Sequence, residues 1–123
     1  MKLFSSALLL RCFLVVARAP QMAEATRTVD VRLTRYEFSP ERIDVQLGER
    51  VRLNVVSVDG PHGFQVKALG LNVRLSARGK TASVDITPTE TGRFEITCSE
   101  YCGRGHGRMK AWLVVTSDAR NAN

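Results

Sequence analysis

One stretch of the chain decides both the fold and the candidate chemistry: Gly92-Arg-Phe-Glu-Ile-Thr-Cys98-Ser-Glu-Tyr-Cys102-Gly-Arg-Gly-His106-Gly-Arg-Met109. Its first residues alternate apolar and polar side chains, which predicts a strand with one face on a core. Two thiols, an imidazole and a thioether then follow within twelve residues. The glycines between them allow a short loop to fold back on itself. Thiolate and thioether favour Cu(I), and imidazole suits both oxidation states of copper, so the loop predicts a copper site.

The same two-residue alternation recurs through the rest of the chain. It predicts short strands near residues 29–33, 43–47, 51–55, 71–75, 84–86, 93–97 and 112–116. No segment after the first 25 residues has sustained helical periodicity. Residues 36–41 are interpreted as a connection, because Pro40 cannot donate a ladder hydrogen bond. Seven or eight short strands separated by Gly, Pro and charged turns predict an all-β antiparallel sandwich.

Length and composition are those of one small globular domain. The chain has 123 residues, of which 44% are hydrophobic and 24% charged, which is enough for one domain with its own core. Its formal net charge is +6, and it falls to +4 without residues 1–25, which hold three basic residues and one acidic residue. The Arg residues are spread along the chain with no dense basic block, so we expect no nucleic-acid partner.

Residues 1–25 are interpreted as a signal peptide, with an uncleaved N-terminal anchor as the alternative. Lys2 supplies positive charge, an apolar run follows, and Ala23-Glu-Ala25 offers small residues for cleavage. Arg11 interrupts that run, which is also short for a membrane span of about 20 residues. We therefore expect a periplasmic or otherwise extracytoplasmic protein, soluble or tethered by its N-terminus. Residues 26–117 would form the domain, and residues 118–123 a flexible tail.

The two loop cysteines allow two interpretations. Exported thiols tend to oxidise, so Cys98 and Cys102 are either a small-loop disulfide or metal ligands. The disulfide leaves His106 and Met109 unexplained, although Met109 by itself could be core filler. Their spacing is a poor match to tetrahedral zinc sites. A blue-copper site needs one cysteine, two histidines and a weak axial methionine, and a second thiolate would allow a pair of coppers to be bridged.

A copper pair needs a second imidazole, and His62 is the other histidine of the chain. It lies in Asp59-Gly-Pro-His62-Gly-Phe64, which we interpret as a loop after a strand over residues 51–58. Loops distant in sequence can meet at one end of a sandwich, so we predict that His62 joins the cysteine loop. Glu100 either faces water with its carboxylate or caps a metal with its backbone carbonyl. Asp59 either orients a ligand or belongs to the turn.

These residues resemble the binuclear CuA domain of subunit II of haem–copper oxidases, which is a cupredoxin. The resemblance runs from residue 59 to residue 115 and includes the histidine segment, Leu71-Asn-Val-Arg-Leu75 and the cysteine loop. Residues 38–43 and 47–51 are similar to the opening strands of cupredoxins. The resemblance implies a cupredoxin-like Greek-key β-sandwich of seven to eight strands. It also implies two copper ions with bridging thiolates, terminal imidazoles and two weak ligands, namely Cys98 and Cys102, His62 and His106, and Met109 with the Glu100 carbonyl.

The resemblance implies an electron carrier that catalyses no reaction on its own. Typical oxidase subunits carry membrane helices before this domain, whereas only the leader precedes it here, so we expect a freestanding exported carrier. Its partner would be a redox protein such as a cytochrome, and a copper-delivery protein could load it. Electrons are expected to pass through the outer edge of His106. Arg104, Arg108 and Lys110 either steer an acidic partner or serve solubility alone.

Two other functions stay open. A periplasmic copper-handling protein, which binds or delivers copper, would use the same ligands. A metal-free module with a Cys98–Cys102 disulfide would use none of them. Copper stoichiometry, colour and a count of free thiols distinguish the three.

Overall fold

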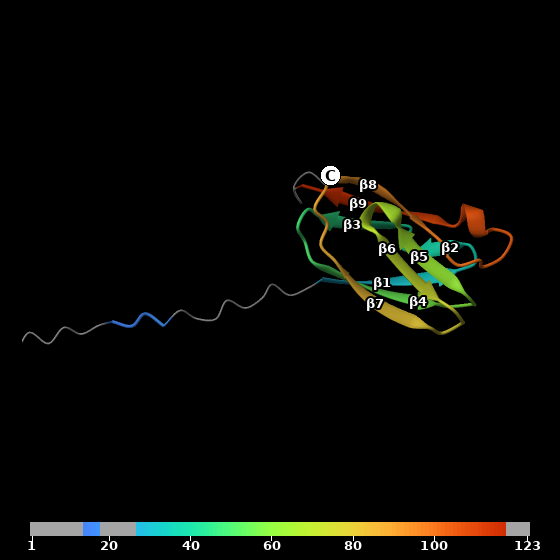
Figure 1. Ribbon diagram of the computed structural model, residues 1–123, viewed down its shortest axis with the longest axis horizontal. Helices are drawn as coiled ribbons and strands as arrows, with labels where there is room; N and C mark the ends of the chain where they lie inside the picture. The colour runs from blue at the N-terminus through green and yellow to red at the C-terminus, as the bar shows by residue number, and fades with distance from the viewer. Residues whose placement is uncertain (1–13, 18–26, 118–123) are drawn as a thin grey trace, which may run out of the picture.

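The computed structural model describes residues 14–17 and 27–117, and the second of these segments is an all-β sandwich. Two sheets pack face to face, with the chain passing repeatedly between them (Figure 1). The all-β fold predicted from the alternation is confirmed. The elements of the described chain are β1 (Arg27–Thr34), β2 (Glu37–Ser39), β3 (Arg42–Gln46), β4 (Val51–Ser57), β5 (His62–Val66), the 3₁₀ turn η1 (Lys67–Leu69), β6 (Leu71–Leu75), β7 (Thr81–Ile86), β8 (Gly92–Thr97), the 3₁₀ turn η2 (His106–Arg108) and β9 (Lys110–Thr116).

The sheets are mixed, and the prediction of a purely antiparallel sandwich is wrong in two pairings. One sheet has the order β2-β1-β4-β7 and the other the order β3-β9-β8-β5-β6. β1 runs parallel to β4, and β3 runs parallel to β9. Between β1 and β4 the chain turns back along β2 and crosses to the other sheet as β3. It therefore returns to the first sheet in its original direction, which places β4 parallel to β1.

Two of the described strands were not expected from the sequence, which raises the count from the predicted seven or eight to nine. β2 lies in the segment interpreted as a connection and pairs antiparallel with β1 at the sheet edge. Pro40 comes just after β2 ends, so it removes no ladder bond. β5 begins at His62, which therefore stands on a strand and not in a loop. Four of the five β5 residues are buried, and a strand buried on both faces shows no alternation in its sequence.

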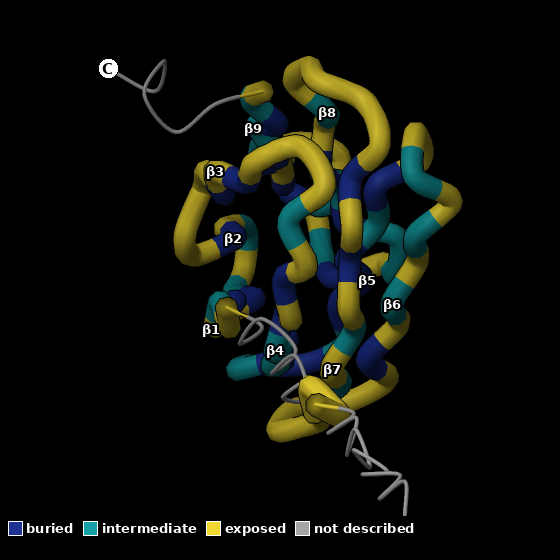
Figure 2. The backbone as a smooth tube through the Cα atoms, turned by 90° about the vertical axis from the view of Figure 1, so that its left-hand side faces the viewer, coloured by how far each residue is buried: buried dark blue, intermediate teal, exposed yellow. Residues whose placement is uncertain are grey.

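The core lies between the sheets, where inward-facing apolar residues alternate with exposed ones (Figure 2). Phe38 of β2 and Phe64 of β5 meet edge to face across the sandwich, with ring centroids 6.0 Å apart at 82°. Such a pair adds about 0.5–1.5 kcal/mol beyond the area it buries. It fixes the first residues of β5 against the other sheet. The most deeply buried members of the core are Val31, Leu33, Phe38, Val51, Leu53, Val55, Phe64, Val66, Ile96, Met109, Ala111 and Leu113.

The two segments that carry the predicted ligands meet at one end of the sandwich. β8 and β9 form an antiparallel pair whose final partners are Thr97 and Lys110, so residues 98–109 form the loop between them. β5 is a neighbour of β8 in the same sheet, and its first residue is His62. Both segments lie at the end of the molecule away from the C-terminus of β9 (Figure 1).

The predicted leader and tail lie outside the described residues, except for residues 14–17. Within the described ranges, the structure contains no helix with the length and apolar character needed to cross a bilayer.

Candidate metal centre

The loop of residues 98–109 is held at both ends by the β8–β9 ladder. Cys98 directly follows β8 and Met109 directly precedes β9, one step beyond the Thr97–Lys110 pair. Both side chains are buried, as is that of Cys102. Inside the loop, the His106 amide donates to the Gly103 carbonyl at 3.1 Å and the Arg108 amide to the Gly105 carbonyl at 3.0 Å. These bonds fold the backbone so that successive donor atoms turn inward.

The loop directs its sulfur and nitrogen atoms toward one another. The Sγ atoms of Cys98 and Cys102 are 3.6 Å apart, and both thiols are free. Cys102 Sγ lies 3.7 Å from Nδ1 of His106 and 3.9 Å from Sδ of Met109. On the other side, Cys98 Sγ lies 3.1 Å from the backbone carbonyl oxygen of Glu100. Five predicted donors thus converge within a single loop.

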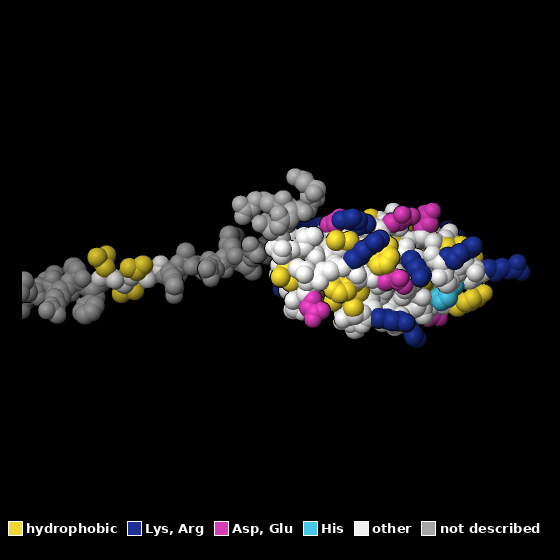
Figure 3. All heavy atoms as spheres, turned by 90° about the horizontal axis from the view of Figure 1, so that it is seen from above, with side chains coloured by type: hydrophobic (Ala, Val, Ile, Leu, Met, Phe, Trp, Pro, Cys, Tyr) yellow, Lys and Arg dark blue, Asp and Glu magenta, His cyan; other side chains and the backbone are white. Residues whose placement is uncertain are grey.

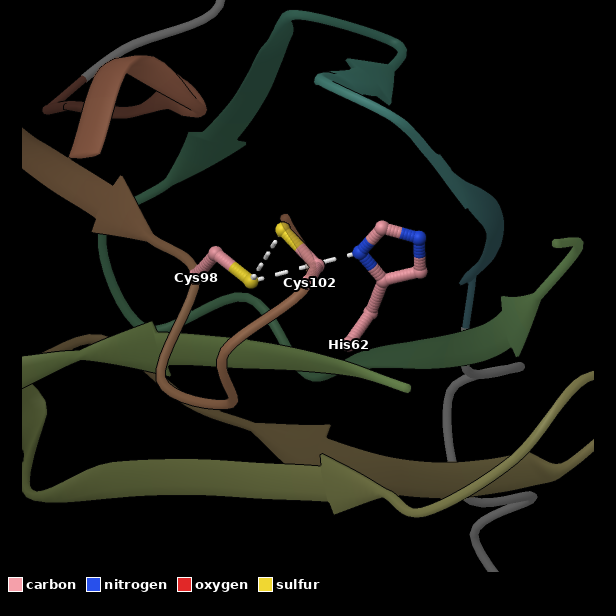
Figure 4. Close-up of side chains that lie close together, drawn as sticks. All are labelled: His62, Cys98 and Cys102. Carbon is pink, nitrogen blue, oxygen red and sulfur yellow. Dashed lines mark hydrogen bonds between the residues drawn. The ribbon is translucent and has the colours of Figure 1, made fainter. Parts of the chain in front are cut away.

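The sixth donor comes from a different part of the chain. Nδ1 of His62, at the start of β5, lies 4.0 Å from Cys98 Sγ, and the His62 side chain is fully buried. Figure 4 shows this ring pointing at the two cysteines, which come from the neighbouring loop. The ligand atoms of His62, Cys98 and Cys102 lie within 4.8 Å of one another. The structure therefore brings all six predicted residues together, and their role as ligands stays a prediction.

Two hydrogen bonds position the predicted metal ligands Cys98 and His62. The Gly63 amide donates to Cys98 Sγ over 3.5 Å, which fixes the position of that sulfur relative to the start of β5. Asp59 Oδ1 lies 2.6 Å from His62 Nε2. A carboxylate at Nε2 holds the proton on that nitrogen and leaves the Nδ1 lone pair free to face Cys98. Of the two roles predicted for Asp59, the structure therefore supports orientation of the imidazole.

The charges around the site follow from burial and these bonds. Burial acts to raise the pKa of Asp59, but hydrogen bonds from the Arg35 amide and from His62 outweigh it and hold that pKa below its ordinary value. The Asp59 carboxylate is therefore ionised at neutral pH. Burial, with the adjacent Cys98 thiol, raises the pKa of Cys102 to about 12. In the metal-free protein Cys102 is thus a neutral thiol, and a metal that binds it must displace a proton.

Two residues that sequence reasoning missed brace the loop from the opposite sheet. Arg35, in the turn between β1 and β2, donates from Nε to the Cys102 carbonyl oxygen at 3.0 Å. The adjacent Tyr36 packs its ring against Gly103 and Gly105, leaving no room for a Cβ at either position. Gly103 also has a φ of +135°, a backbone conformation that favours glycine. Arg35 and Cys102 are 67 positions apart, and nothing in the local sequence marks their contact.

The donor set has the chemistry of a copper site. It contains two thiols, two imidazoles, a thioether and a carbonyl oxygen, and soft sulfur with imidazole nitrogen is the combination that copper prefers. Structural zinc sites have four strong Cys or His ligands and no thioether. The residues present fit a copper centre better than a zinc centre for this reason. A pair of thiols whose sulfurs face each other at 3.6 Å also suits donors shared between two ions.

One histidine connects the buried cluster to solvent. His62 is inaccessible, whereas His106 is partly exposed, and the ring of Tyr101 tilts against it with centroids 5.7 Å apart. Tyr101 is 70% exposed. Two surface hollows, of about 390 and 300 Å³, lie near η1, at the far end of β5 from His62. They involve no residue of the donor cluster.

The chain is similar in sequence to a known domain family and to known proteins. Residues 6–115 match the profile of the cupredoxin-like domain family. Over 88 residues the chain is 33% identical to cytochrome c oxidase subunit 2 of Thermus thermophilus. The matched region covers 72% of this chain and 64% of that relative. A second Thermus thermophilus sequence of the same description is also 33% identical, and the matched region is 52% of its length. The chain thus spans between half and two thirds of these relatives.

Solved structures share the fold. The periplasmic domain of subunit II of cytochrome oxidase (CoxB) of Bradyrhizobium japonicum superposes with a TM-score of 0.69 at 19% identity, covering 81% of this chain and 91% of that one. The metal-binding domain of the Cu(I)-exporting P-type ATPase of Streptococcus pneumoniae gives a TM-score of 0.63 at 15% identity, with 78% and 91% covered. At these identities the likeness establishes the architecture alone.

Proposed function

The chain belongs to the cupredoxin-like domain family and is related to cytochrome c oxidase subunit II, and on this basis we propose that it carries electrons through a binuclear CuA centre. The family and the cluster of candidate ligands together support the first element of this proposal, which is that the site binds copper. The finer statement, that two coppers share one site, rests on the second cysteine. A mononuclear blue-copper site needs a single thiolate, and this loop presents two.

The observation that carries the proposal is the position of His62. Its Nδ1 lies 4.0 Å from Cys98 Sγ, although 36 positions separate the two residues and they belong to different elements. A buried histidine whose Nε2 already bonds a carboxylate is an oriented ligand. Without His62 the loop would supply one imidazole only. With His62, each of two metals can have its own imidazole ligand.

The residues then divide into strong and weak donors. The thiolates of Cys98 and Cys102 would be shared by the two coppers, the imidazoles of His62 and His106 would each hold one, and the Met109 thioether and the Glu100 carbonyl would be weak ligands. A copper pair held in this way would supply one-electron redox chemistry in which the two ions share the change in charge. The protein contributes stiffness, because a close-packed core resists deformation and the loop is anchored to β8 and β9. The arrangement offers no nucleophile–base pair, and we propose no reaction beyond electron transfer.

We propose that electrons pass through the exposed edge of His106. Figure 3 shows a histidine at the surface at one end of the molecule, between hydrophobic side chains and Lys or Arg side chains. Of the two histidines, His106 is partly exposed and His62 is fully buried. Arg104 and Arg108 flank His106 and form no ion pair with any residue that the structure describes, whereas Lys110 pairs with Glu95 at 3.5 Å. The two arginines are therefore the charges available to an acidic redox partner such as a cytochrome.

Charge reversal at these arginines tests the steering role. We expect Arg104→Glu or Arg108→Glu to slow electron transfer to an acidic redox protein about tenfold at low salt, because opposite charge raises association rates. The difference should shrink as salt screens the charges. Stopped-flow rates across ionic strengths measure both effects. Lys67→Glu makes the same charge change on η1, at the far end of β5, and should leave the rate nearly unaltered. Equal effects at all three positions would leave only a solubility role.

We place the protein outside the cytoplasm, with residues 1–25 as signal peptide or membrane anchor. The related domain from Bradyrhizobium japonicum is periplasmic by its description, and free thiols at the site suit an exported protein only if a metal holds them. A copper-delivery protein is a proposed second partner, since the centre must be filled after export. N-terminal sequencing of the protein recovered from the producing cell would locate the cleavage site.

Copper reconstitution tests the main proposal. Two tightly held coppers per chain, a purple colour and a paramagnetic resonance spectrum with hyperfine splitting from both nuclei would support the carrier. One labile and colourless Cu(I) would support copper handling in its place. Failure to bind copper, together with a mass that shows two fewer hydrogens and no titratable thiol, would identify the disulfide module. Metal analysis, absorption and resonance spectra on one sample distinguish the three outcomes.

A change at Asp59 should weaken copper binding without removing a ligand. We expect Asp59→Asn to lower copper affinity about tenfold or more, because a neutral amide holds the His62 tautomer less firmly than a carboxylate 2.6 Å from Nε2. Competition with a chelator measures the affinity. Asp85→Asn is the matched control, since Asp85 pairs with Arg50 and Arg52 on the surface. Identical affinities of the two variants would show that Asp59 serves the turn only.

A further inference from the structure

We propose that Arg35 is a positioning residue of the copper site, and that the turn between β1 and β2 ties the two ligand-bearing segments together. We call Arg35 and Tyr36 the turn clamp. The expected effects on copper release and on the reduction potential rest on the proposed copper function. The contacts between the turn and the two segments are properties of the metal-free protein. The turn belongs to the sheet that contains β1, whereas both ligand-bearing segments belong to the opposite sheet.

The backbone of the clamp reaches the first ligand-bearing segment. The Arg35 amide donates to Asp59 Oδ2 at 2.9 Å, and Asp59 Oδ1 contacts His62 Nε2. One carboxylate therefore joins the turn to the buried imidazole. The two oxygens are used separately, so moving the turn would move the hydrogen-bond partner of His62.

The side chain of the clamp reaches the second segment. Arg35 Nε donates to the backbone carbonyl of Cys102 at 3.0 Å. The guanidinium also passes close to Gly60, where a Cβ would lie 3.2 Å from Nη2. It thus occupies the space between the segment that leads to His62 and the segment that carries Cys102. This hydrogen bond has a charged donor and is partly buried, and charge-assisted hydrogen bonds are stronger than neutral ones.

The second residue of the clamp extends the contact along the same loop. Tyr36 lies against Gly103 and Gly105, and a Cβ on Gly105 would lie 2.8 Å from Tyr36 Cδ1. The loop can rest on the ring only because both positions are glycine. Arg35 and Tyr36 together therefore contact the loop backbone at three positions, Cys102, Gly103 and Gly105. The contacts hold Cys102 and the start of η2 in place before any metal binds.

The charge of Arg35 has a separate consequence. A guanidinium stays protonated at all ordinary pH values, and here it is bonded to the main chain of a bridging cysteine. A fixed positive charge disfavours the more positive, oxidised state of a nearby centre. Arg35 should therefore raise the reduction potential as well as slow the release of copper. A purely structural residue would affect release and leave the potential unaltered.

Three variants separate these roles. Arg35→Gln removes the charge and the Nε donor, and we expect copper release to a chelator to accelerate about tenfold and the reduction potential to fall. Arg35→Lys keeps the charge without the Nε geometry, so it should release copper as fast as Arg35→Gln and hold a potential near that of the parent protein. Arg32→Gln, an equal change on an exposed residue of β1, is the control and should match the parent in both measurements.

A metal-free measurement makes the test independent of the copper chemistry. The Cys98 and Cys102 side chains are 7% and 4% exposed, so a thiol reagent reacts only when the loop opens. Arg35→Gln should accelerate that reaction in the apoprotein, and Arg32→Gln should not. The clamp is overturned if Arg35→Gln and Arg32→Gln react and release copper at the same rate. If the parent protein fails to take up two coppers while the thiol rates still differ, the CuA proposal fails and the clamp stands.

Discussion

Replacing Cys102 by serine is expected to abolish the paired copper centre. The variant should bind one copper or none, lose the purple colour and show no hyperfine splitting from a second nucleus. Cys102 Sγ lies 3.6 Å from Cys98 Sγ, 3.7 Å from His106 Nδ1 and 3.9 Å from Met109 Sδ. Three of the other five candidate ligand atoms therefore lie within 4 Å of this sulfur. A hydroxyl is a hard donor and stays protonated at neutral pH, so it cannot take the bridging role of a thiolate.

Met109→Leu is the matched comparison in the same loop. Met109 is buried to 1% exposure, and leucine of similar volume preserves the packing at a cost below about 1.5 kcal/mol. Because the thioether is a weak ligand, this variant should keep two coppers and alter only the potential and the spectrum. Metal analysis and resonance spectra on both variants make the comparison. Two coppers with shared spin in Cys102→Ser would refute a bridging role for this sulfur.

The strands that could be predicted were those with one face on the core. β1, β3, β4 and β8 alternate apolar and polar residues, and the structure buries most of the apolar ones. β5 gave no such signal because it is buried on both faces. The parallel pairings of β1 with β4 and of β3 with β9 depend on where the chain crosses between sheets. Strand periodicity carries no information on that crossing.

Only some residues of the candidate site could likewise be predicted from the sequence. The donors of residues 98–109 could be found because they are close in sequence and chemically unusual together. His62 could be found because the chain has one other histidine and because the segment around it resembles a known domain. Arg35, Tyr36 and Gly63 could not, since each acts through a contact with a residue far along the chain. An exposed Arg and a glycine beside a histidine have no distinctive sequence pattern.

Gly63 should be the glycine whose substitution most damages the site. We expect Gly63→Ala to lower the free energy of unfolding of the apoprotein by about 2–3 kcal/mol, toward the upper part of the range for overpacking, and Tm by roughly 10–20 °C. A Cβ at this position would meet Ser99 Oγ and would lie 2.7 Å from the Ser99 amide nitrogen and 2.8 Å from that of Glu100. Two of these atoms belong to the backbone, so a rotamer change cannot relieve the contact. Thermal and denaturant unfolding measure the loss.

Gly63→Ala should disturb the candidate metal centre in particular, because the Gly63 amide donates to Cys98 Sγ and the displaced backbone carries the Glu100 carbonyl. Copper affinity should therefore fall together with stability. Gly107→Ala is the control within the same loop: its φ is not positive, and no atom lies within 4 Å of the added methyl, so its stability should change by less than about 0.5 kcal/mol. Strain from backbone conformation does not enter either variant, since Gly63 also has no positive φ. Equal Tm values for the two alanine variants would mean that β5 and the cysteine loop are not packed as tightly as this geometry requires, and the position of His62 beside Cys98 would lose its support.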